Sequence, residues 1–259
     1  MPDAAVLYAS ADHIATITLN RPDNRNSMTP EMLDAFALAS ERARADRELR
    51  CIVVTGTGTC FSSGADFKST LQRATGAPHE RSYAMYEPFL SLLDIEVPII
   101  GALNGHTVGG GFGLALVCDV RIGALDAKYG ANFVRLGLAP GMAISYLLPR
   151  IIGLPRASEL LFAGRLVDGR QAEHLGILSR AVPAGDVLAE AMQLAREIAA
   201  AAPLAVRETK AAIRRGLGLD VRAAARAESY AQAETISTDD AREGIAALLA
   251  KRDPVFTGT

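Results

Sequence analysis

The chain has 259 residues, of which 49% are apolar and 22% charged, and its 27 basic and 29 acidic side chains leave a net charge of −2. This composition is typical of a folded, soluble protein and excludes an intrinsically disordered one. The balanced charge argues against a nucleic-acid partner. No segment has the pattern of a secretory signal or of a bilayer span, and the three cysteines form no disulfide or zinc pattern. We therefore expect a cytoplasmic protein without membrane association.

Predicted strands and helices alternate in the first half of the chain. Residues 6–10 and 14–19 alternate apolar and polar side chains around a polar break, which predicts a hairpin. Thr29 suits a helix N-cap and Pro30 the first helical position, so a helix follows. The β-branched run at 51–55 is typical of a strand buried on both faces. The predicted buried stripe of the helix consists of Met32, Leu33, Phe36, Ala37 and Ala43.

The rest of the chain is predicted to become progressively more helical. A helix at about 80–93 leads to a strand at 99–103, and a glycine-rich loop then opens a helix that ends near 118, before a strand at 120–123. Strand patterns nearly vanish after Gly141. Helices are predicted there at 143–148, 157–162, 169–175, 186–201, 204–215, 223–234 and 239–251. We expect a core over residues 1–200 and a C-terminal helical region over 201–259.

Several common active-site motifs are absent. The GGGFG cluster lacks the spacing of a dinucleotide-binding fingerprint, and the chain holds no phosphate-binding P-loop, no G-x-S-x-G elbow and no H-E-x-x-H zinc motif. Its four histidines are dispersed along the sequence. We therefore expect no metal and no bound cofactor.

Two glycine-rich turns, each placed after a predicted buried strand, remain as candidates. One spans Phe61–Lys68 and the other Gly109–Gly111, at the start of a helix, where the first backbone N–H groups lack helical partners. Either turn alone could merely allow tight packing. Together they predict two amides that converge on one carbonyl oxygen and stabilise negative charge on it, as in an oxyanion hole.

The motifs around these turns resemble the crotonase family, also called the enoyl-CoA hydratase/isomerase superfamily. The resemblance covers nearly the whole chain. It is carried, in order, by ITLNRPDNRNSM, CIVVTGTGTCFSSGADFK, ALNGHTVGGGFGLALVCDVRI, LGLAPGM and STDDAREGIAALLAKRDPVF. It implies an α/β fold, a spiral of ββα repeats with C-terminal helices that pack in a homotrimer or a dimer of trimers. It also implies acyl-coenzyme A substrates, with coenzyme A present only as part of the substrate.

The resemblance also assigns roles to individual residues. The oxyanion amides would be those of Ala65 and Gly110. The expected contacts to coenzyme A come from Asn24, Arg25, Ser27, Ser63, Ala65, Asp66, Phe67 and Lys251. Arg25 and Lys251 also have purely structural interpretations: Arg25 as a charged loop residue, and Lys251 as a solvated residue at a helix end.

The chain departs from the family pattern at the acid–base positions. The resemblance places a glutamate at each of two positions, which Gly113 and Phe133 occupy here. Water addition requires one group to activate water and another to protonate carbon, and neither of these residues can titrate. Candidate replacement proton carriers are His79, Tyr83, Tyr86, Asn132 and Ser145, each of which also has a purely structural interpretation.

Three hypotheses follow. The first is an acyl-CoA enzyme of the lyase or isomerase class, nominally an enoyl-CoA hydratase of fatty acid metabolism, in which ordinary hydration is weak or absent. The second is a non-catalytic acyl-CoA binding protein. The third is a structural assembly component, which would bind no coenzyme A. The sequence leaves open the acyl group, the pathway, and the choice between trimer and hexamer.

Overall fold

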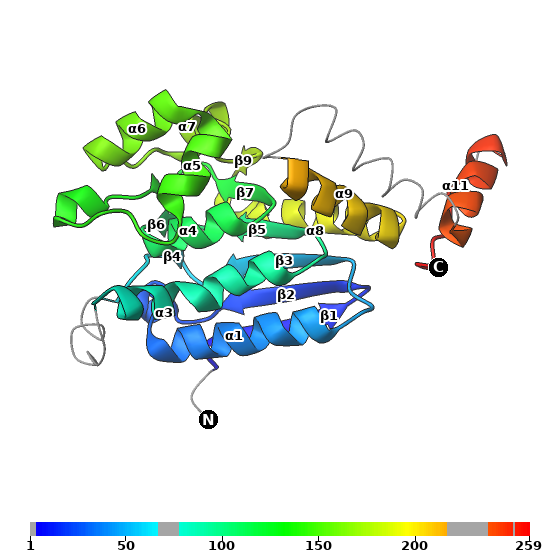
Figure 1. Ribbon diagram of the computed structural model, residues 1–259, viewed down its shortest axis with the longest axis horizontal. Helices are drawn as coiled ribbons and strands as arrows, with labels where there is room; N and C mark the ends of the chain where they lie inside the picture. The colour runs from blue at the N-terminus through cyan, green and yellow to red at the C-terminus, as the bar shows by residue number, and fades with distance from the viewer. Residues whose placement is uncertain (1–3, 67–77, 217–237, 251) are drawn as a thin grey trace.

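The computed structural model describes residues 4–66, 78–216, 238–250 and 252–259 (Figure 1). Its main sheet has six strands in the order β1-β2-β3-β5-β7-β9. Only the first pair is antiparallel, and the other neighbours run parallel. The strands are β1 (Val6–Ala11), β2 (Ile14–Leu19), β3 (Cys51–Gly56), β5 (Ile99–Leu103), β7 (Val120–Ala124) and β9 (Arg180–Val182). The predicted hairpin and the predicted central strand are thereby confirmed.

A second, three-stranded parallel sheet lies beside the first. It consists of β4 (Cys60–Ser62), β6 (His106–Val108) and β8 (Tyr129–Gly130), in the order β4-β6-β8. Each of its strands follows a strand of the main sheet along the chain, and helices connect the successive pairs. This repetition of two strands and a helical segment is the ββα spiral that the resemblance implied.

Helices pack on the main sheet and on one another. The helix α1 packs on β1 and β2, α3 lies beside α1, and α8 packs on β3, β5 and β7 (Figure 1). The α-helices are α1 (Pro30–Ala45), α3 (Pro78–Leu90), α4 (Gly110–Val117), α5 (Ile144–Ile152), α6 (Leu154–Ala163), α7 (Gly169–His174), α8 (Val187–Ala199), α9 (Pro203–Gly216) and α11 (Asp239–Ala250). The 3-10 turns are η1 (Pro22–Asn24), η2 (Ser91–Asp94), η3 (Phe133–Leu136) and η4 (Ala184–Asp186). No helix of the described residues is both long and apolar enough to cross a bilayer.

The start of α1 follows the sequence rules closely. The Thr29 hydroxyl accepts a hydrogen bond from the Met32 amide at 3.2 Å, as an N-cap should. The buried stripe contains Met32, Leu33, Phe36 and Ala43 as predicted, but Ala37 is only half-buried, and Ala39 and Ser40 are buried instead. The Phe36 ring meets the Phe89 ring edge-on at 4.7 Å between centroids, which joins α1 to α3.

Strand patterns nearly vanish after Gly141 in the sequence, and among the described residues the one strand beyond it is β9. This strand has three residues, lies at the edge of the main sheet and is partly exposed, so it is too short to give a periodic apolar pattern. The two- and three-residue strands of the second sheet escape detection for the same reason. The predicted helix at 223–234 lies outside the described residues, and the division of the chain at residue 200 stays a prediction.

The C-terminal tail is tied both to α11 and to the body of the protein. Asp240 is buried, and its carboxylate accepts hydrogen bonds from the amides of Thr257 at 2.7 Å and Gly258 at 2.9 Å. The Arg50 guanidinium donates to the carbonyl of Ala199 at the end of α8 and to that of Phe256 in the tail. The final residues are therefore held near the junction of α8 and α9.

Candidate active site

The first glycine turn follows β4 and is fastened by the loop at 21–28. Two backbone bonds join the turn to this loop: the Ser63 amide donates to the Arg25 carbonyl at 3.0 Å, and the Met28 amide donates to the Gly64 carbonyl at 2.8 Å. The Ser62 hydroxyl donates to the Asn26 carbonyl at 2.8 Å and accepts from the Gly64 amide at 3.3 Å. These bonds fix the orientation of the chain as it enters Ala65.

The second turn opens the fully buried helix α4. Gly109 has φ +58, a left-handed conformation that suits glycine, and Gly110 is the first helical residue. A side chain at Gly110 would collide with the Met28 sulfur. The backbone conformation thus favours glycine at 109, and the Met28 side chain fills the space that a side chain at 110 would need.

The two turns touch. A Cβ atom added to Gly64 would lie 2.7 Å from the Gly110 nitrogen, and one added to Gly110 would lie 3.6 Å from the Gly64 Cα. Among the described residues, the amides of Ala65 and Gly110 have no hydrogen-bond acceptor. Two unpartnered N–H donors on adjoining turns are the minimum that an oxyanion hole needs.

Asn26 lies within the stretch 24–27 that the resemblance places along coenzyme A, but the sequence analysis missed its role in holding the loop. It is completely buried and has φ +52. Its side-chain amide nitrogen donates to the carbonyls of Thr57 at 3.0 Å and Cys60 at 2.9 Å, and its side-chain oxygen accepts from the Arg21 amide at 2.7 Å. Asn26 thus joins the loop, β3 and β4. The only local signal was the tolerance of asparagine for the left-handed conformation.

The predicted contacts to coenzyme A lie together in part. Arg25 is exposed on the loop, Asn24 is half-buried, and Ser27 is buried, with its amide donating to the Asn24 carbonyl at 3.3 Å. Ser63 and Asp66 are half-buried in the adjoining turn. Phe67 and Lys251 lie outside the described residues.

The two vacated acid–base positions are close to α4 and have apolar surroundings. Gly113 is buried in α4 and faces Met142, which is itself completely buried. Phe133 begins η3 and is half-buried against the core, with its Cζ 3.9 Å from the position of an added Cβ on Gly109. An apolar wall therefore lies next to the second turn.

The candidate proton carriers separate into different environments. Tyr86, on α3, is half-buried, and its ring carbon Cζ lies 2.9 Å from the position of an added Cβ on Gly141. Tyr83 is 60% exposed, and a hydrogen bond with Glu87 and the charge of that carboxylate raise the pKa of the Tyr83 phenol. Of these two tyrosines, Tyr86 is the one that α3 brings to the turn before α5.

The other three candidates are less informative. Asn132 is half-buried immediately before η3, and its carbonyl accepts from the Arg135 amide at 3.0 Å. Ser145 is exposed in the first turn of α5. His79 belongs to α3, and its side chain is outside the described part of the molecule.

The turns, the helix and the ββα spiral agree with the comparisons. The family model for enoyl-CoA hydratase/isomerase matches residues 9–259. The chain belongs to this family. It is 35% identical over 260 residues to YngF of Bacillus subtilis, with the whole of both chains covered, and 30% identical over 248 residues to the short-chain-enoyl-CoA hydratase of Clostridium acetobutylicum, with 95% of each covered. The crystal structure of enoyl-CoA hydratase from Bacillus anthracis is similar with a TM-score of 0.94 at 30% identity, covering 98% of this chain and 100% of that one.

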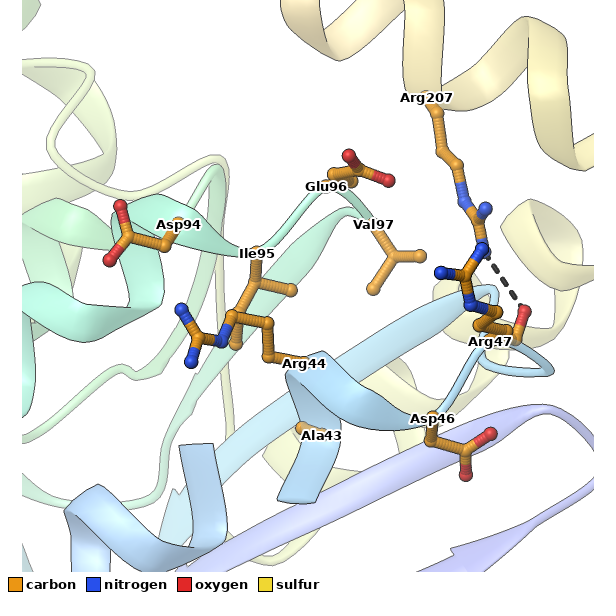
Figure 2. Close-up of a pocket in the computed structure, with 9 residues that line it drawn as sticks. All are labelled: Ala43, Arg44, Asp46, Arg47, Asp94, Ile95, Glu96, Val97 and Arg207. Carbon is orange, nitrogen blue, oxygen red and sulfur yellow. Dashed lines mark hydrogen bonds between the residues drawn. The ribbon is translucent and has the colours of Figure 1, made fainter. Parts of the chain in front are cut away.

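Membership of the family leaves unexplained two clefts that lie among the described residues. One, of about 310 Å³, lies between the end of α1, residues 94–97 and α9 (Figure 2). Arg207 reaches across it and donates to the Arg47 carbonyl at 3.0 Å. The other, of about 450 Å³, lies between α8, α9 and the start of β7. No residue of the two glycine turns lines either cleft.

The second cleft ends at a charged cluster centred on Asp119. The carboxylate of this residue accepts from the Ile99 amide at 2.8 Å and pairs with buried Lys210 at 2.8 Å and with Arg214 at 3.2 Å. Burial lowers the pKa of Lys210, and Asp119 opposes that effect. Asp119 is thus paired with two cations and a backbone amide, and this arrangement joins α9 to the sheet.

Proposed function

We propose that this protein binds acyl-coenzyme A thioesters with the thioester oxygen between the amides of Ala65 and Gly110. Negative charge develops on that oxygen when the α-carbon becomes enolate-like, and two fixed N–H donors stabilise it. One such donor can contribute about 2.7–4 kcal/mol to the transition state. The observation that carries the proposal is the contact between two turns whose amides lack acceptors among the described residues.

The proposed contacts to the coenzyme A moiety and the proposed oligomeric state are taken from the resemblance to the family. Asn24, Arg25, Ser27, Ser63 and Asp66 lie on the loop and turn that adjoin Ala65, where coenzyme A would approach the site. We propose a homotrimer or a dimer of trimers in the cytoplasm, with no cofactor besides the coenzyme A of the substrate. Phe67 and Lys251 remain proposed contacts on the resemblance alone.

Ordinary hydration of crotonyl-CoA is proposed to be weak or absent. Water addition requires a proton to leave water and another to reach the α-carbon, and each positioned proton transfer contributes about 10²–10⁴-fold in rate. Gly113 and Phe133 offer no titratable group for either step. The protein is therefore proposed to be an enzyme of the lyase or isomerase class that catalyses a reaction of acyl-CoA thioesters other than the hydration of crotonyl-CoA.

A panel of acyl-CoA thioesters tests this function. The purified protein is titrated calorimetrically with butyryl-CoA and then assayed for turnover of crotonyl-CoA, of 3-enoyl-CoA and of carboxyacyl-CoA thioesters. We expect binding, slow or no hydration, and turnover of another member. Binding without any turnover supports the alternative, a non-catalytic acyl-CoA binding protein. Absence of binding to every thioester, or rapid hydration of crotonyl-CoA, contradicts the proposal.

Tyr86 is the proposed proton carrier among the five candidates, because its ring reaches the turn that packs on Gly113 through Met142. Tyr86→Phe removes the hydroxyl and keeps the ring. We expect turnover to fall about 10²-fold or more, with a changed pH profile and unchanged butyryl-CoA affinity. Tyr83→Phe is the matched control on the same helix and should leave turnover unchanged. Equal effects of the two substitutions would exclude this role for Tyr86.

A further inference from the structure

Gly113 and Met142 compete for one volume. A Cβ atom added to Gly113 would lie 3.1 Å from both the Cγ and the backbone oxygen of Met142, and closer still to its Cβ. The contact with the Met142 Cβ is shorter than real Cβ atoms show, so one of the two backbones would have to move. A side chain at position 113 is therefore incompatible with Met142 in its observed place.

Met142 cannot easily move aside. It is completely buried, and it and Ala143 have φ of +55 and +53, a left-handed conformation that costs a residue with a side chain about 1–2 kcal/mol. The Ile144 amide donates to the Gly141 carbonyl at 3.2 Å, and the Leu147 amide donates to the Ala143 carbonyl at 2.9 Å. These bonds hold the strained turn at the start of α5.

The opposite side of the turn is also occupied. The ring of Tyr86 stands against Gly141, so the turn is confined between α3 and α4. Strained backbone persists only where the surrounding structure enforces it, and such positions are concentrated at functional sites.

We infer that Met142 is a specificity-determining residue, whose side chain occupies the volume into which a carboxylate at position 113 would project and so prevents the site from adding water. This inference rests on the proposed function, because it assumes that an acyl-CoA thioester binds beside α4. In hydration a base removes a proton from water, the hydroxide oxygen bonds to Cβ, and an acid delivers a proton to Cα. With Met142 in place, α4 can present neither group from position 113.

Restoration of hydration tests the inference directly. The double variant Gly113→Glu/Phe133→Glu is compared with the triple variant that adds Met142→Gly, and Met142→Gly alone is the control. Glycine at 142 removes the side chain and also suits the left-handed backbone. We expect the triple variant to hydrate crotonyl-CoA about 10²-fold or more faster than the double variant. Met142→Gly alone should gain no hydration, because it still lacks both carboxylates. Equal rates in the double and triple variants overturn the inference.

A thermal unfolding cycle keeps the inference testable if a glutamate variant does not fold. Gly113→Ala is made with Met142 and with Met142→Gly. We expect Gly113→Ala to lower the melting temperature by several degrees when Met142 is present. The decrease should be smaller when glycine stands at 142, because only the contact with the backbone oxygen of residue 142 remains and alanine favours helix. The same decrease in both backgrounds overturns the inference.

Butyryl-CoA titration separates the two levels of the proposal. If the cycle shows the expected coupling but the unmodified protein binds no acyl-CoA, the proposed function fails, and with it the specificity role of Met142, while the packing of 113 against 142 stands. If butyryl-CoA binds and the cycle shows no coupling, the proposed function stands and only the inference about Met142 fails.

Discussion

The turn at Ser62–Ala65 and the turn at Pro140–Ala143 adjoin the same helix, α4, but different forces hold them. The first is fixed by hydrogen bonds that converge from the loop at 21–28, with Asn26 at their centre. The second is confined by the packing of Met142 on Gly113 and of Tyr86 on Gly141, and it contains two residues in a left-handed conformation.

The difference follows from what each turn has to provide. Hydrogen bonds are directional, so a polar network can fix the direction of a backbone amide such as that of Ala65. Apolar packing controls volume more than direction, and it can exchange one side chain for another if the total volume is kept. The amide geometry can thus persist while the residues that would carry protons change.

Disruption of the contact between the turns is expected to have the largest effect. In Gly64→Ala the new methyl group would lie 2.7 Å from the Gly110 nitrogen and 2.9 Å from the Val108 oxygen, and φ is +84. The turns must separate, so we expect turnover of the best thioester in the panel to fall about 10²–10³-fold, the loss typical of one oxyanion donor.

The matched control for Gly64 is another glycine with positive φ. Gly137 has φ +73, and an added Cβ would meet no atom within 4 Å. Gly137→Ala introduces the backbone strain alone, so its turnover should stay close to that of the unmodified protein. If Gly64→Ala also keeps its turnover, the two amides do not act together on the thioester.

Removal of the centre of the polar network is the next largest change. Asn26→Ala leaves the buried Cys60 carbonyl, the part-buried Thr57 carbonyl and the part-buried Arg21 amide without their partner. A buried group left without its partner costs about 1–3 kcal/mol, and a part-buried one costs less. We expect the free energy of unfolding to fall by about 3 kcal/mol, measured with urea. Asn24→Ala is the control, because within the described part of the chain its side-chain oxygen accepts only a long bond of 3.4 Å, from the Ser27 amide. Comparable losses in both variants would mean that Asn26 has no special role.

A substitution in the turn at 140–143 should change stability less, and should raise it. Ala143 is exposed and has φ +53, so Ala143→Gly removes conformational strain without loss of packing. We expect stability to rise by up to about 1 kcal/mol. Ala189→Gly, at an exposed helical position in α8, should instead lower it by about 0.5–1 kcal/mol. A decrease at both positions would show that the turn is not strained.

The sequence predicted the elements whose signals are local. Thr29 and Pro30 mark the start of α1, and the β-branched run of β3 marks a strand buried on both faces. The glycine turns were found because glycines after strands form a recognisable local pattern. The choice of the Ala65 and Gly110 amides as the pair that faces the ligand came only from the resemblance.

The residues that were missed depend on contacts between distant positions. The side chain of Asn26 bonds to carbonyls 31 and 34 residues away, and Met142 meets Gly113 from another element. No periodicity or spacing reports such pairs. The strands β4, β6, β8 and β9 have three residues or fewer, and their pairing rather than their own side-chain pattern defines them.

An ion pair near the C-terminus, between Glu243 and Arg252, can be compared with the uncharged hydrogen bonds of Asn26. The Glu243 carboxylate, on α11, accepts hydrogen bonds from the Arg252 guanidinium at 2.6 and 2.8 Å and from the Val255 amide at 2.9 Å. These bonds, led by those from Arg252, lower the pKa of Glu243 from 4.5 to about 2.

The pH dependence follows from the direction of that shift. A carboxyl group with a lowered pKa stabilises the folded state above pH 4.5, and the contribution disappears as the pH falls toward 2. We expect a carboxyl ¹³C titration of Glu243 with its midpoint near 2, accompanied by loss of amide protection at Val255. The bonds of Asn26 carry no titrating group, so the Arg21 amide should keep its protection over the same range as long as the protein stays folded. Glu243→Gln should abolish the pH dependence of amide protection at Val255. A titration midpoint of Glu243 near 4.5 in the unmodified protein would show that its bonds with Arg252 and Val255 do not hold the tail.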